Sequence, residues 1–507
     1  MVTIVHPIKI KEALDPHVRL ILQELGGGRA DGTAYDTAWV GRLATRYPHQ
    51  QFTAALDWLR QNQLNDGTWG APSYHHHDRY ISTLAAMLAL HDAGADGRDA
   101  RRIEFGRQAL WRIVGKLERD DQDTIGFPLL SVALTKEAQE RGYVVPLPTP
   151  RYAKPYQQRV DALLAQQQRD WRVNTLAFSI EGLYKAIEKH DIVLEANQSA
   201  GTSVAATAGY LLRQPHDGAL HYVINAVLQE GTGAAPVIVP IDLFEIGWTI
   251  NHLRYANAIT PDDPHVRPLL DFAWEAWQQM GGRGVGFSSH YSVPDVDTTA
   301  AIYMILKWGG YPVRADVFRY YEKDDCFCTF PNETDPSTSA NVRTLAALRM
   351  IEDDHPDKQR WIEKAVTFLQ AHDRNGAFWV DKWHTSPYYV NATAIWALSG
   401  YDDALRDSRC TWIQQTQNDD GGWGYHTVGI STPEETAYCL EALLWYDAHV
   451  QAVDDAILGS AVTYLLDHMD DDRFTPLWIG KSLYTPHYPI KSAIIGALYN
   501  YKKRSEQ

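Results

Sequence analysis

A pattern of Trp, Gln and Asp-Gly occurs near both ends of the chain and constrains the fold more than any other feature. The first copy consists of Trp58, Gln63, Asp66, Gly67, Trp69 and Gly70. The second copy has the same spacing and consists of Trp412, Gln417, Asp420, Gly421, Trp423 and Gly424. A looser copy covers residues 368–379. Each copy ends one helical pattern and leads into another. A Gly turn, a Trp over a helix end and a Gln bonded to free backbone groups are typical of a helical hairpin.

Helical patterns also dominate the rest of the sequence. Strand signals are scarce, and the main hydrophobic period is helical. Successive helical hairpins close into an α/α barrel, and the first copy lies too far from the later ones for a single barrel. A chain of 507 residues also exceeds one ordinary core. The sequence therefore predicts an all-α protein with two α/α-barrel domains.

Two aspartates enter an apolar helical run in the stretch VPDVDTTAAIYMIL. Pro294 suits the first turn of a helix, so Asp295 and Asp297 are expected at its N-terminal end. Capping is the ordinary role of an Asp there, but two Asp followed by Thr298 and Thr299 exceed what one cap needs. Burial and a neighbouring like charge both favour a neutral carboxyl. Such a carboxyl is a candidate general acid.

Composition excludes several classes of function. The net charge of −16, with no compensating Lys/Arg cluster, argues against a nucleic-acid partner. Four cysteines in so long a chain indicate reduced thiols in a cytosolic protein. The sequence shows no signal peptide and no apolar run of transmembrane length, so a soluble cytoplasmic protein is expected. The GGGRADG segment near residue 30 is expected to be a flexible connector, because it lacks the context of a phosphate loop.

The aspartate stretch resembles the centre of class II terpene cyclases, whose signature is D-x-D-D or, in bacteria, D-x-D-T-T. The resemblance continues through Gly-Tyr, Ala-Asp-Val-Phe and Glu-Lys-Asp, and TAYDTAWVG near the N-terminus also matches. The Trp/Gln copies correspond to the QW repeats of that family, which tie outer helices to inner ones. The resemblance implies a γ domain inserted into a β domain. The expected parts are 1–29 as the N-terminal helix of the β domain, 30–220 as the γ domain and 221–507 as the rest of the β domain.

The resemblance also implies roles for individual residues. Asp297 would protonate a terminal alkene, and Asp295 would stabilise the conjugate base that remains. Thr298 and Thr299 replace the second Asp of the signature and could supply hydrogen bonds. Asn341 falls where related cyclases carry an Asn that hydrogen-bonds the acid, although a helix cap is the competing interpretation.

A diphosphate site is implied at a second place. Glu181, in the stretch SIEG, stands where the family has an acidic residue that can hold Mg²⁺, with a solvated helical Glu as the alternative. Lys481, Lys382 and Arg343 are candidate diphosphate ligands because Lys and Arg are the usual phosphate contacts. Trp383 is expected in the wall of the substrate site, where aromatic faces would stabilise cations.

Two apolar residues bear on the product. Phe178 and Val237 stand where members that form ent-copalyl diphosphate carry a His and an Asn that position a water base. Without that base, a bicyclic cation survives longer and rearranges before it loses a proton. The nearest pattern is the bacterial halimadienyl (tuberculosinyl) diphosphate synthase type, which shares AYDTAWV, DKWH, EETAYC and PLWI-x-K-x-LY. We therefore expect a cyclase of geranylgeranyl diphosphate that needs only Mg²⁺ and yields a halimadienyl or kolavenyl (clerodane) diphosphate.

Several alternatives stay open at this point. A copalyl diphosphate synthase and a drimenyl diphosphate synthase acting on farnesyl diphosphate share the signature. Triterpene cyclases are longer, protein prenyltransferases need a zinc site that the sequence does not supply, and a helical-repeat scaffold has no use for paired buried aspartates. Expected partners are a class I terpene synthase or a phosphatase acting downstream, with no stable membrane insertion. The oligomeric state is expected to be monomer or dimer.

Two further motifs are expected to carry no chemistry. Asp353, Asp354 and Asp357 spell D-D-x-x-D, but Pro356 places them in a loop or at a helix start. The run of three histidines at 75–77 is expected to lie in a polar loop after the first hairpin turn, because adjacent side chains face different ways on a regular element.

Overall fold

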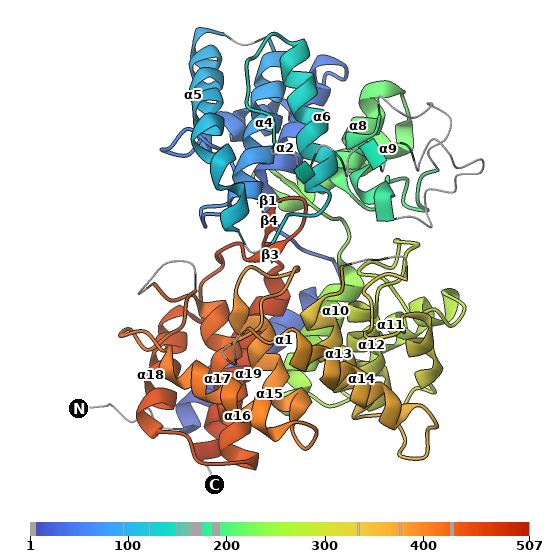
Figure 1. The fold of residues 1–507 in the computed structure, drawn as a ribbon, viewed down its shortest axis with the longest axis vertical. Helices are drawn as coiled ribbons and strands as arrows, with labels where there is room; N and C mark the ends of the chain where they lie inside the picture. The colour runs from blue at the N-terminus through green and yellow to red at the C-terminus, as the bar shows by residue number, and fades with distance from the viewer. Residues whose placement is uncertain are drawn as a thin grey trace.

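The computed structural model shows two helical lobes, one above the other in the view of Figure 1. It describes residues 7–505 apart from 95, 121, 149–150, 153, 155–156, 159–160, 162–174, 185–192, 332, 334, 375, 377 and 426–429. The strands of the described part are two-residue segments that form two antiparallel pairs. These are β1 (Gly32–Thr33) with β2 (Ala235–Pro236), and β3 (Trp478–Ile479) with β4 (Leu483–Tyr484). The predicted all-α class is confirmed.

The upper lobe contains the first part of the chain after α1. Its α-helices are α2 (Ala34–Gly41), α3 (Gln50–Gln61), α4 (His76–Asp92), α5 (Gly97–Ile113), α6 (Phe127–Glu140), α8 (Val204–Arg213) and α9 (Asp217–Glu230). Short 3-10 helices join them: η1 (Arg42–Thr45), η2 (Val114–Arg119) and η4 (Thr175–Gly182).

The lower lobe contains α1 and the C-terminal half of the chain. Its helices are α1 (Pro7–Glu24), α10 (Asp242–Tyr255), α11 (Arg267–Gln279), α12 (Val296–Trp308), η6 (Ala315–Tyr320), α13 (Thr338–Leu348), α14 (Lys358–Ala371), α15 (Pro387–Leu398), α16 (Asp403–Gln415), α17 (Pro433–His449), α18 (Asp455–His468) and α19 (His487–Ser505).

The helices of the lower lobe form a closed barrel. Helices α10, α12, α13, α15, α17 and α19 pack each against the next, and α19 returns to α10. Helices α11, α14, α16 and α18 pack outside them, each against an inner neighbour. The inner helices are buried along nearly their whole lengths, whereas the outer ones bury a single face. A helix that is apolar on all sides needs such a buried position, which explains the sequence pattern.

The Trp/Gln copies make the contacts that the sequence analysis predicted. The indole Nε1 of Trp69 donates to Leu59 O, in the last turn of α3, at 2.8 Å. Gln63 Nε2 donates to Gly67 O and Arg102 O, both at 2.9 Å. The second copy repeats these bonds, from Trp423 to Ile413, and from Gln417 to Gly421 and Ile457. Each copy therefore fastens the end of an outer helix to the turn and to the next outer helix.

The glycine segment after α1 is held in place, and the prediction of a flexible connector is wrong. The backbone N–H groups of Gly26, Gly28 and Arg29 donate to the carboxylate of Glu245 at 2.9–3.1 Å. Gly28 has φ of +69°, and a Cβ there would lie 2.5 Å from Ile241 N. A residue with a side chain would not fit this approach, so the glycine is needed here.

Buried apolar residues form one large cluster in each lobe. The cluster of the upper lobe runs from Ala34 to Ala235, and that of the lower lobe includes α1. The chain thus starts in the lower lobe, passes through the upper one and returns. The domain boundaries at 30 and 220 stay a prediction. Both strand pairs lie where the lobes meet, as Figure 1 shows, and β4 contacts β1 there.

Candidate active site

The two aspartates of the signature lie at the N-terminus of the inner helix α12. Asp295 is the N-cap residue, and its Oδ1 accepts a hydrogen bond from Thr298 N at 2.7 Å. Asp297 follows in the first turn, and both carboxyls are nearly fully buried. Pro294 precedes the cap, so the expectation that it occupies the first turn is wrong by two residues. Asp295 therefore combines the ordinary role of a cap with a place beside Asp297.

Asp297 has a strong basic partner that the sequence analysis placed elsewhere. Arg343, on α13, donates through Nε to Asp297 Oδ1 at 2.8 Å. Its Nη2 donates to the hydroxyl of Tyr389 at 2.5 Å, and its guanidinium lies 4.1 Å from the ring centroid of Trp248. Arg343 is thus committed to the acid. The prediction that it binds a diphosphate is wrong.

Both carboxyls hold their protons more firmly than an exposed Asp. Burial raises the pKa of Asp297 to about 6, and the charge of Arg343 opposes the rise. Burial also raises the pKa of Asp295 to about 7, against the hydrogen bond from Thr298 and with help from the charge of Asp297. A carboxyl of this kind keeps its proton to a higher pH than an exposed Asp, and Arg343 stabilises the anion that remains when the proton leaves Asp297.

Asn341 does not touch the acid, and its predicted role is wrong. Its Oδ1 accepts from Phe327 N at 2.9 Å, while its Nδ2 donates to Phe327 O and Ser337 O. Asn391 makes the corresponding bonds to Trp379 and to the first residue of α15 in the next hairpin. The amide at this position fastens the loop that precedes an inner helix, so no group is left for Asp297.

The two threonines of the signature also serve the local structure. Thr299 Oγ1 donates to Val285 O at 3.0 Å, accepts from Val285 N at 3.0 Å and contacts the hydroxyl of Tyr321. Its hydroxyl thus supplies hydrogen bonds to the loop before α12, and a catalytic role for Thr299 stays a prediction. Thr298 contributes its backbone N–H to Asp295, which is support for the pair and not contact with the acid.

A cluster of aromatic side chains connects Arg343, the partner of the acid, with strand β3 at the lobe junction. Phe244 stacks on Trp248 with ring centroids 3.9 Å apart, and Trp478 meets both rings edge-on. The imidazole of His384 stacks on Tyr389 at 4.8 Å and meets Trp478 edge-on. These side chains, together with Tyr438 and Tyr484, are called the aromatic chamber below. Their faces can stabilise a carbocation.

A buried ion pair marks the second predicted site, at the lobe junction. Lys481 Nζ lies 2.6 Å from Glu181 Oε1, and neither side chain is exposed. Lys481 also donates to Ser203 Oγ at 2.5 Å, and the Tyr35 hydroxyl donates to Glu181 Oε1 at 3.0 Å. Glu181 comes from η4 of the upper lobe, whereas Lys481 lies between β3 and β4. The alternative of a solvated helical Glu is wrong.

Glu181 could hold a metal ion at its second oxygen. Its Oε2 is buried and has no hydrogen-bond partner in the described part of the chain. Mg²⁺ is commonly held by one or two carboxylates together with substrate phosphates, so this oxygen fits it. The ammonium of Lys481 beside it supplies positive charge for an anion.

The two residues that bear on the product lie next to this ion pair. The ring of Phe178 is 4.8 Å from Lys481 Nζ, and Phe178 meets Phe287 edge-on. Val237 is fully buried and faces Gly480. A Cβ added to Gly480 would lie 3.2 Å from Cγ2 of Val237. The structure thus brings both predicted residues to one apolar wall beside Lys481.

Lys382 and Trp383 lie elsewhere in the lower lobe. Lys382 forms an ion pair with Glu333, and its ammonium lies 5.0 Å from the ring centroid of Trp383. Trp383 meets Phe330 edge-on, and its backbone carbonyl accepts a hydrogen bond from the N–H of Ile479. No contact joins either residue to Lys481 in the described structure. Their roles toward the substrate stay predictions.

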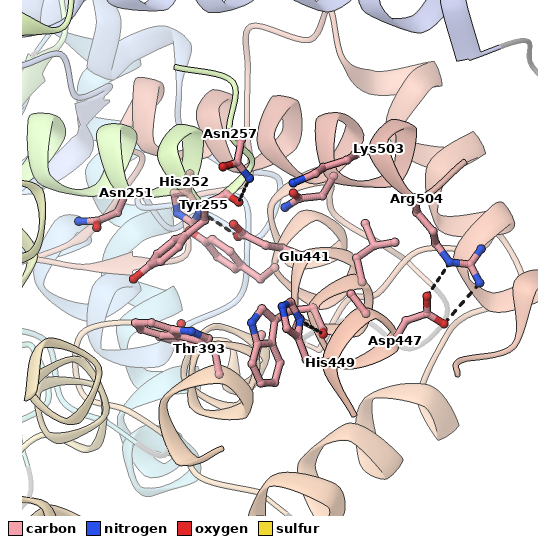
Figure 2. A pocket seen from close by; sticks show the side chains of 18 of the residues that line it. Asn251, His252, Tyr255, Asn257, Thr393, Glu441, Asp447, His449, Lys503 and Arg504 are labelled. Atoms are coloured by element: carbon pink, nitrogen blue, oxygen red, sulfur yellow. Dashed lines mark hydrogen bonds and ion pairs between the residues drawn. The ribbon is translucent and has the colours of Figure 1, made fainter. Parts of the chain in front are cut away.

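A cavity of about 730 Å³ lies among the C-terminal halves of the inner helices (Figure 2). One end is formed by Trp248, Arg343 and Tyr389, next to the aromatic chamber. The wall includes His252 and Glu441, whose side chains are 2.9 Å apart. Polar residues of α19, such as Arg504, line the other end.

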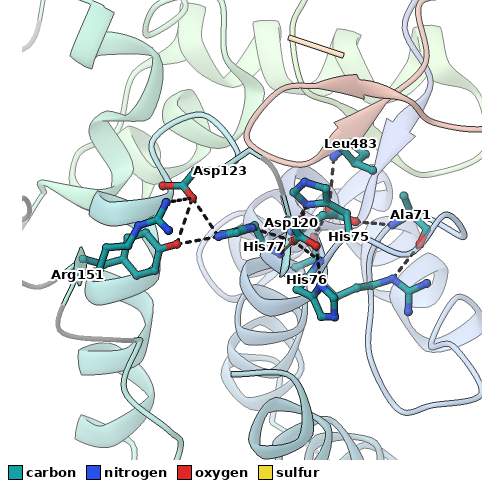
Figure 3. Close-up of polar contacts among 12 residues, drawn as sticks. Ala71, His75, His76, His77, Asp120, Asp123, Arg151 and Leu483 are labelled. Atoms are coloured by element: carbon teal, nitrogen blue, oxygen red, sulfur yellow. Dashed lines mark hydrogen bonds and ion pairs between the residues drawn. The ribbon is translucent and has the colours of Figure 1, made fainter. Parts of the chain in front are cut away.

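The three histidines after the first hairpin are buried, so the predicted polar loop is wrong (Figure 3). His75 is the N-cap of α4, and His76 and His77 begin the helix. Nδ1 of His76 lies 2.5 Å from Asp120 Oδ1, and Nδ1 of His77 lies 2.8 Å from Asp120 Oδ2. The second nitrogen of His77 faces Asp123. These hydrogen bonds connect the start of α4 to the segment after η2. The histidine cluster therefore has a structural role.

Several predictions concerned what the chain lacks. The four cysteines are free and buried. Asp353 lies in the turn before α14 and pairs with Lys358. The carboxylates of D-D-x-x-D therefore do not lie together on one face of a helix. No helix in the described part of the chain has the length and hydrophobicity needed to cross a bilayer.

Comparisons with known proteins identify the family. The model of the squalene-hopene cyclase C-terminal domain matches residues 304–473. A type B diterpene cyclase of Mycobacterium tuberculosis is 35% identical over 501 residues, which cover 94% of this chain and 96% of that protein. The chain is a bacterial class II diterpene cyclase. An ent-copalyl diphosphate synthase of a Streptomyces species is 29% identical over 503 residues, 94% of each chain.

A solved relative supports the architecture of the cyclase. The ent-copalyl diphosphate synthase from Streptomyces platensis superposes with a TM-score of 0.80 at 25% identity, over 97% of this cyclase and 99% of that chain. The predicted fold class, two α/α barrels, is therefore confirmed, and the protein is an enzyme.

The sequence analysis missed part of the aromatic chamber of the cyclase. His384 and Glu434 were quoted only as letters of the shared stretches DKWH and EETAYC. In the structure His384 Nε2 lies 3.1 Å from Glu434 Oε1, inside the chamber. The sequence did contain a signal for this pair. A His and a Glu that stand beside aromatic residues at the start of inner helices are expected to be buried, and buried polar groups are expected to pair with each other.

Proposed function

We propose that the protein cyclises geranylgeranyl diphosphate to a bicyclic diterpenyl diphosphate, with the diphosphate retained. The observation that carries the proposal is the buried carboxyl of Asp297, paired with Arg343 and placed at the aromatic chamber. An alkene is a very weak base, so its protonation requires a neutral carboxyl in an apolar site whose anion is then stabilised. Asp297 with Arg343 meets both requirements.

In the proposed reaction Asp297 donates its proton to the terminal double bond of the substrate. The double bonds then close two rings in turn, and positive charge moves toward the diphosphate end. Arg343 stabilises the Asp297 carboxylate, and the aromatic faces stabilise the cation. Loss of a proton from carbon ends the sequence. The Lys481–Glu181 pair is proposed to hold the diphosphate end, where Glu181 would bind Mg²⁺ that neutralises phosphate charge.

We further propose a rearranged product, a halimadienyl or kolavenyl diphosphate. The support is the apolar wall of Phe178 and Val237 next to Lys481, two positions whose side chains cannot form hydrogen bonds. A cation formed in the second ring finds no water held by a His and an Asn at these two positions. Hydride and methyl shifts then move the charge back toward the first ring.

The test is the product itself. Purified enzyme is incubated with geranylgeranyl diphosphate or farnesyl diphosphate and Mg²⁺, then treated with phosphatase, and the alcohols are identified by mass spectrometry and NMR. A rearranged bicyclic C20 alcohol is expected. Copalol alone would refute the rearrangement, and a drimane alcohol formed faster from farnesyl diphosphate would refute the chain length. The double variant F178H/V237N is expected to shift the product toward copalol.

A further inference from the structure

The aromatic chamber contains a second buried carboxyl, which the proposed reaction has not yet used. Glu434 lies in the first turn of α17 and is 1% exposed. Its Oε1 accepts from Trp478 Nε1 at 2.7 Å and from the Tyr438 hydroxyl at 3.0 Å, and His384 Nε2 lies 3.1 Å away. Its Oε2 is equally buried and has no hydrogen-bond partner among the residues that the structure describes. One oxygen is thus held by three groups, and the other is left without any.

The neighbouring histidine is placed to donate to Glu434. His384 Nδ1 lies 3.1 Å from Ser386 N, which can only donate, and 3.3 Å from Ser386 O, and the shorter contact favours an acceptor at Nδ1. The proton of the ring is then on Nε2, which points at Glu434 Oε1. All three groups at this oxygen are donors, and the arrangement suits a carboxylate, which only accepts. His384 itself has no lone pair left for another proton.

A buried oxygen without a donor has lost its water and gained nothing in return, so it destabilises the folded protein. Most buried side-chain polar atoms have a hydrogen-bond partner, so an unpartnered carboxylate oxygen beside aromatic rings calls for a role. A partner that is present only during the reaction would supply one. A cationic intermediate in the chamber is such a partner.

Glu434 and the acid border the same aromatic chamber. His384 stacks on Tyr389, whose hydroxyl accepts from Arg343, and Arg343 binds Asp297. Tyr484 is near both carboxyls: burial raises its pKa, and the charges of Tyr389, Glu434 and Asp297 add to the rise. Glu434 is therefore linked to the acid through His384, Tyr389 and Arg343, and the inference places it toward the end of the substrate that Asp297 would protonate.

We infer that Glu434 Oε2 is the base that ends the reaction, with His384 as the positioning residue that holds it. Glu434 removes a proton from a carbon next to the cationic centre. The C–H bond breaks, its electron pair becomes the new C=C bond, and the proton forms an O–H bond on Oε2. Between turnovers Glu434 releases this proton and Asp297 regains one, so each cycle is balanced.

The inference deepens the proposed function and rests on it, since it assumes a bicyclic cation in the chamber. It also explains why rearrangement would occur. A cation in the second ring forms close to the diphosphate end, whereas this base lies at the end protonated by Asp297. The charge must migrate through successive shifts before a carbon beside it reaches Oε2.

Glu434→Gln is the first test, because Gln keeps the size and one accepting oxygen for the three donors but cannot take a proton. We expect formation of the wild-type product to fall at least about 100-fold, the range in which general bases contribute. The remaining turnover should give alcohols from capture of the cation by water, or alkenes lost earlier on the path. Products are identified by mass spectrometry, and folding is checked by thermal melting.

Glu435→Gln is the matched control. Glu435 follows Glu434 on helix α17 and is also buried, but both of its oxygens accept hydrogen bonds, Oε1 from Tyr425 N at 3.0 Å and Oε2 from the Thr432 hydroxyl at 2.8 Å. This variant is expected to keep the wild-type product. His384→Gln, which can still donate to Glu434, should retain more of the wild-type product ratio than His384→Phe, which cannot.

Two outcomes would overturn the inference. One is wild-type product at wild-type rate from Glu434→Gln. The other is a slower Glu434→Gln enzyme with an unchanged product distribution, which would mean a purely structural carboxyl. If the wild-type enzyme makes only copalyl diphosphate, the proposed product fails instead, and the Glu434→Gln products still show separately whether Glu434 is the base.

Discussion

Asp297→Asn tests the central carboxyl in two ways, through catalysis and through stability. The amide has nearly the same shape but carries no acidic proton, so turnover should be abolished while the fold is retained. The more informative effect concerns stability at different pH values. Its direction depends on whether burial or the ion pair with Arg343 dominates at this position.

The magnitude follows from the pKa of Asp297. The rise from 3.8 to about 6 means that the folded protein binds this proton more tightly than the unfolded chain. Between these pH values the folded state holds more protons, so its stability falls as the pH rises, and above pH 6 the loss is complete. At 1.36 kcal/mol per pKa unit the loss is about 3 kcal/mol. The amide of the variant behaves like the protonated form at every pH.

The variant should therefore match the wild type below about pH 4 and exceed it by about 3 kcal/mol at pH 8. The pKa of about 6 for Asp297 in the folded protein already includes the effect of Arg343. Denaturant unfolding at pH 4.5 and pH 8 measures the difference, with Asp353→Asn, an exposed carboxyl, as the control that should show no such pH dependence. Removal of one partner from a buried ion pair can instead cost about 3–5 kcal/mol. An Asp297→Asn variant that is less stable than wild type at pH 8 would refute the reasoning.

Three further variants test other parts of the site. Arg343→Met should raise the pKa of Asp297 by about 1–3 units. Because the acid must be protonated to react, the pH at which kcat falls should then be higher than in the wild type. An unchanged pH profile would contradict the ion pair. Glu181→Gln should raise both the Mg²⁺ concentration needed for the half-maximal rate and the KM for the substrate, with the product unchanged. An unaltered Mg²⁺ dependence would exclude a metal-binding role for Glu181. Asn341→Ala should lower the melting temperature through the loss of three buried hydrogen bonds, each worth about 1 kcal/mol, without a change in the pH profile, which a partner of the acid would alter.

Much of this structure could be predicted because it depends on short stretches of sequence. The Trp/Gln hairpins and the aspartates at the start of an inner helix are local patterns, in which a few neighbouring residues decide the conformation. Arg343 could not be placed in this way, because it lies 46 residues from Asp297 and meets it only when α13 packs beside α12. A charged residue within an apolar helix is nevertheless a signal, since it must find a partner when it is buried.

The contacts of Asn341 and Thr299 have a common physical cause. Both residues lie about one turn inside an inner helix, where a polar side chain can reach back to the loop before it. Thr436 does the same in another hairpin, where its Oγ1 accepts from Trp423 N at 3.0 Å. A polar residue here is needed because loop N–H and C=O groups are buried between the helices. The role recurs along the chain, so it belongs to the fold and not to the reaction.

One short hairpin joins the two ends of the proposed reaction. Trp478 on β3 donates to Glu434 in the aromatic chamber, Lys481 in the turn pairs with Glu181, and Tyr484 on β4 lies near Asp297. Three residues of chain span at most about 11 Å between Trp478 and Lys481. In the proposed reaction the substrate would have to be folded for its double bonds to close into rings. The β3–β4 hairpin supplies side chains to both the proposed diphosphate site and the aromatic chamber, so it would help to hold such a folded chain.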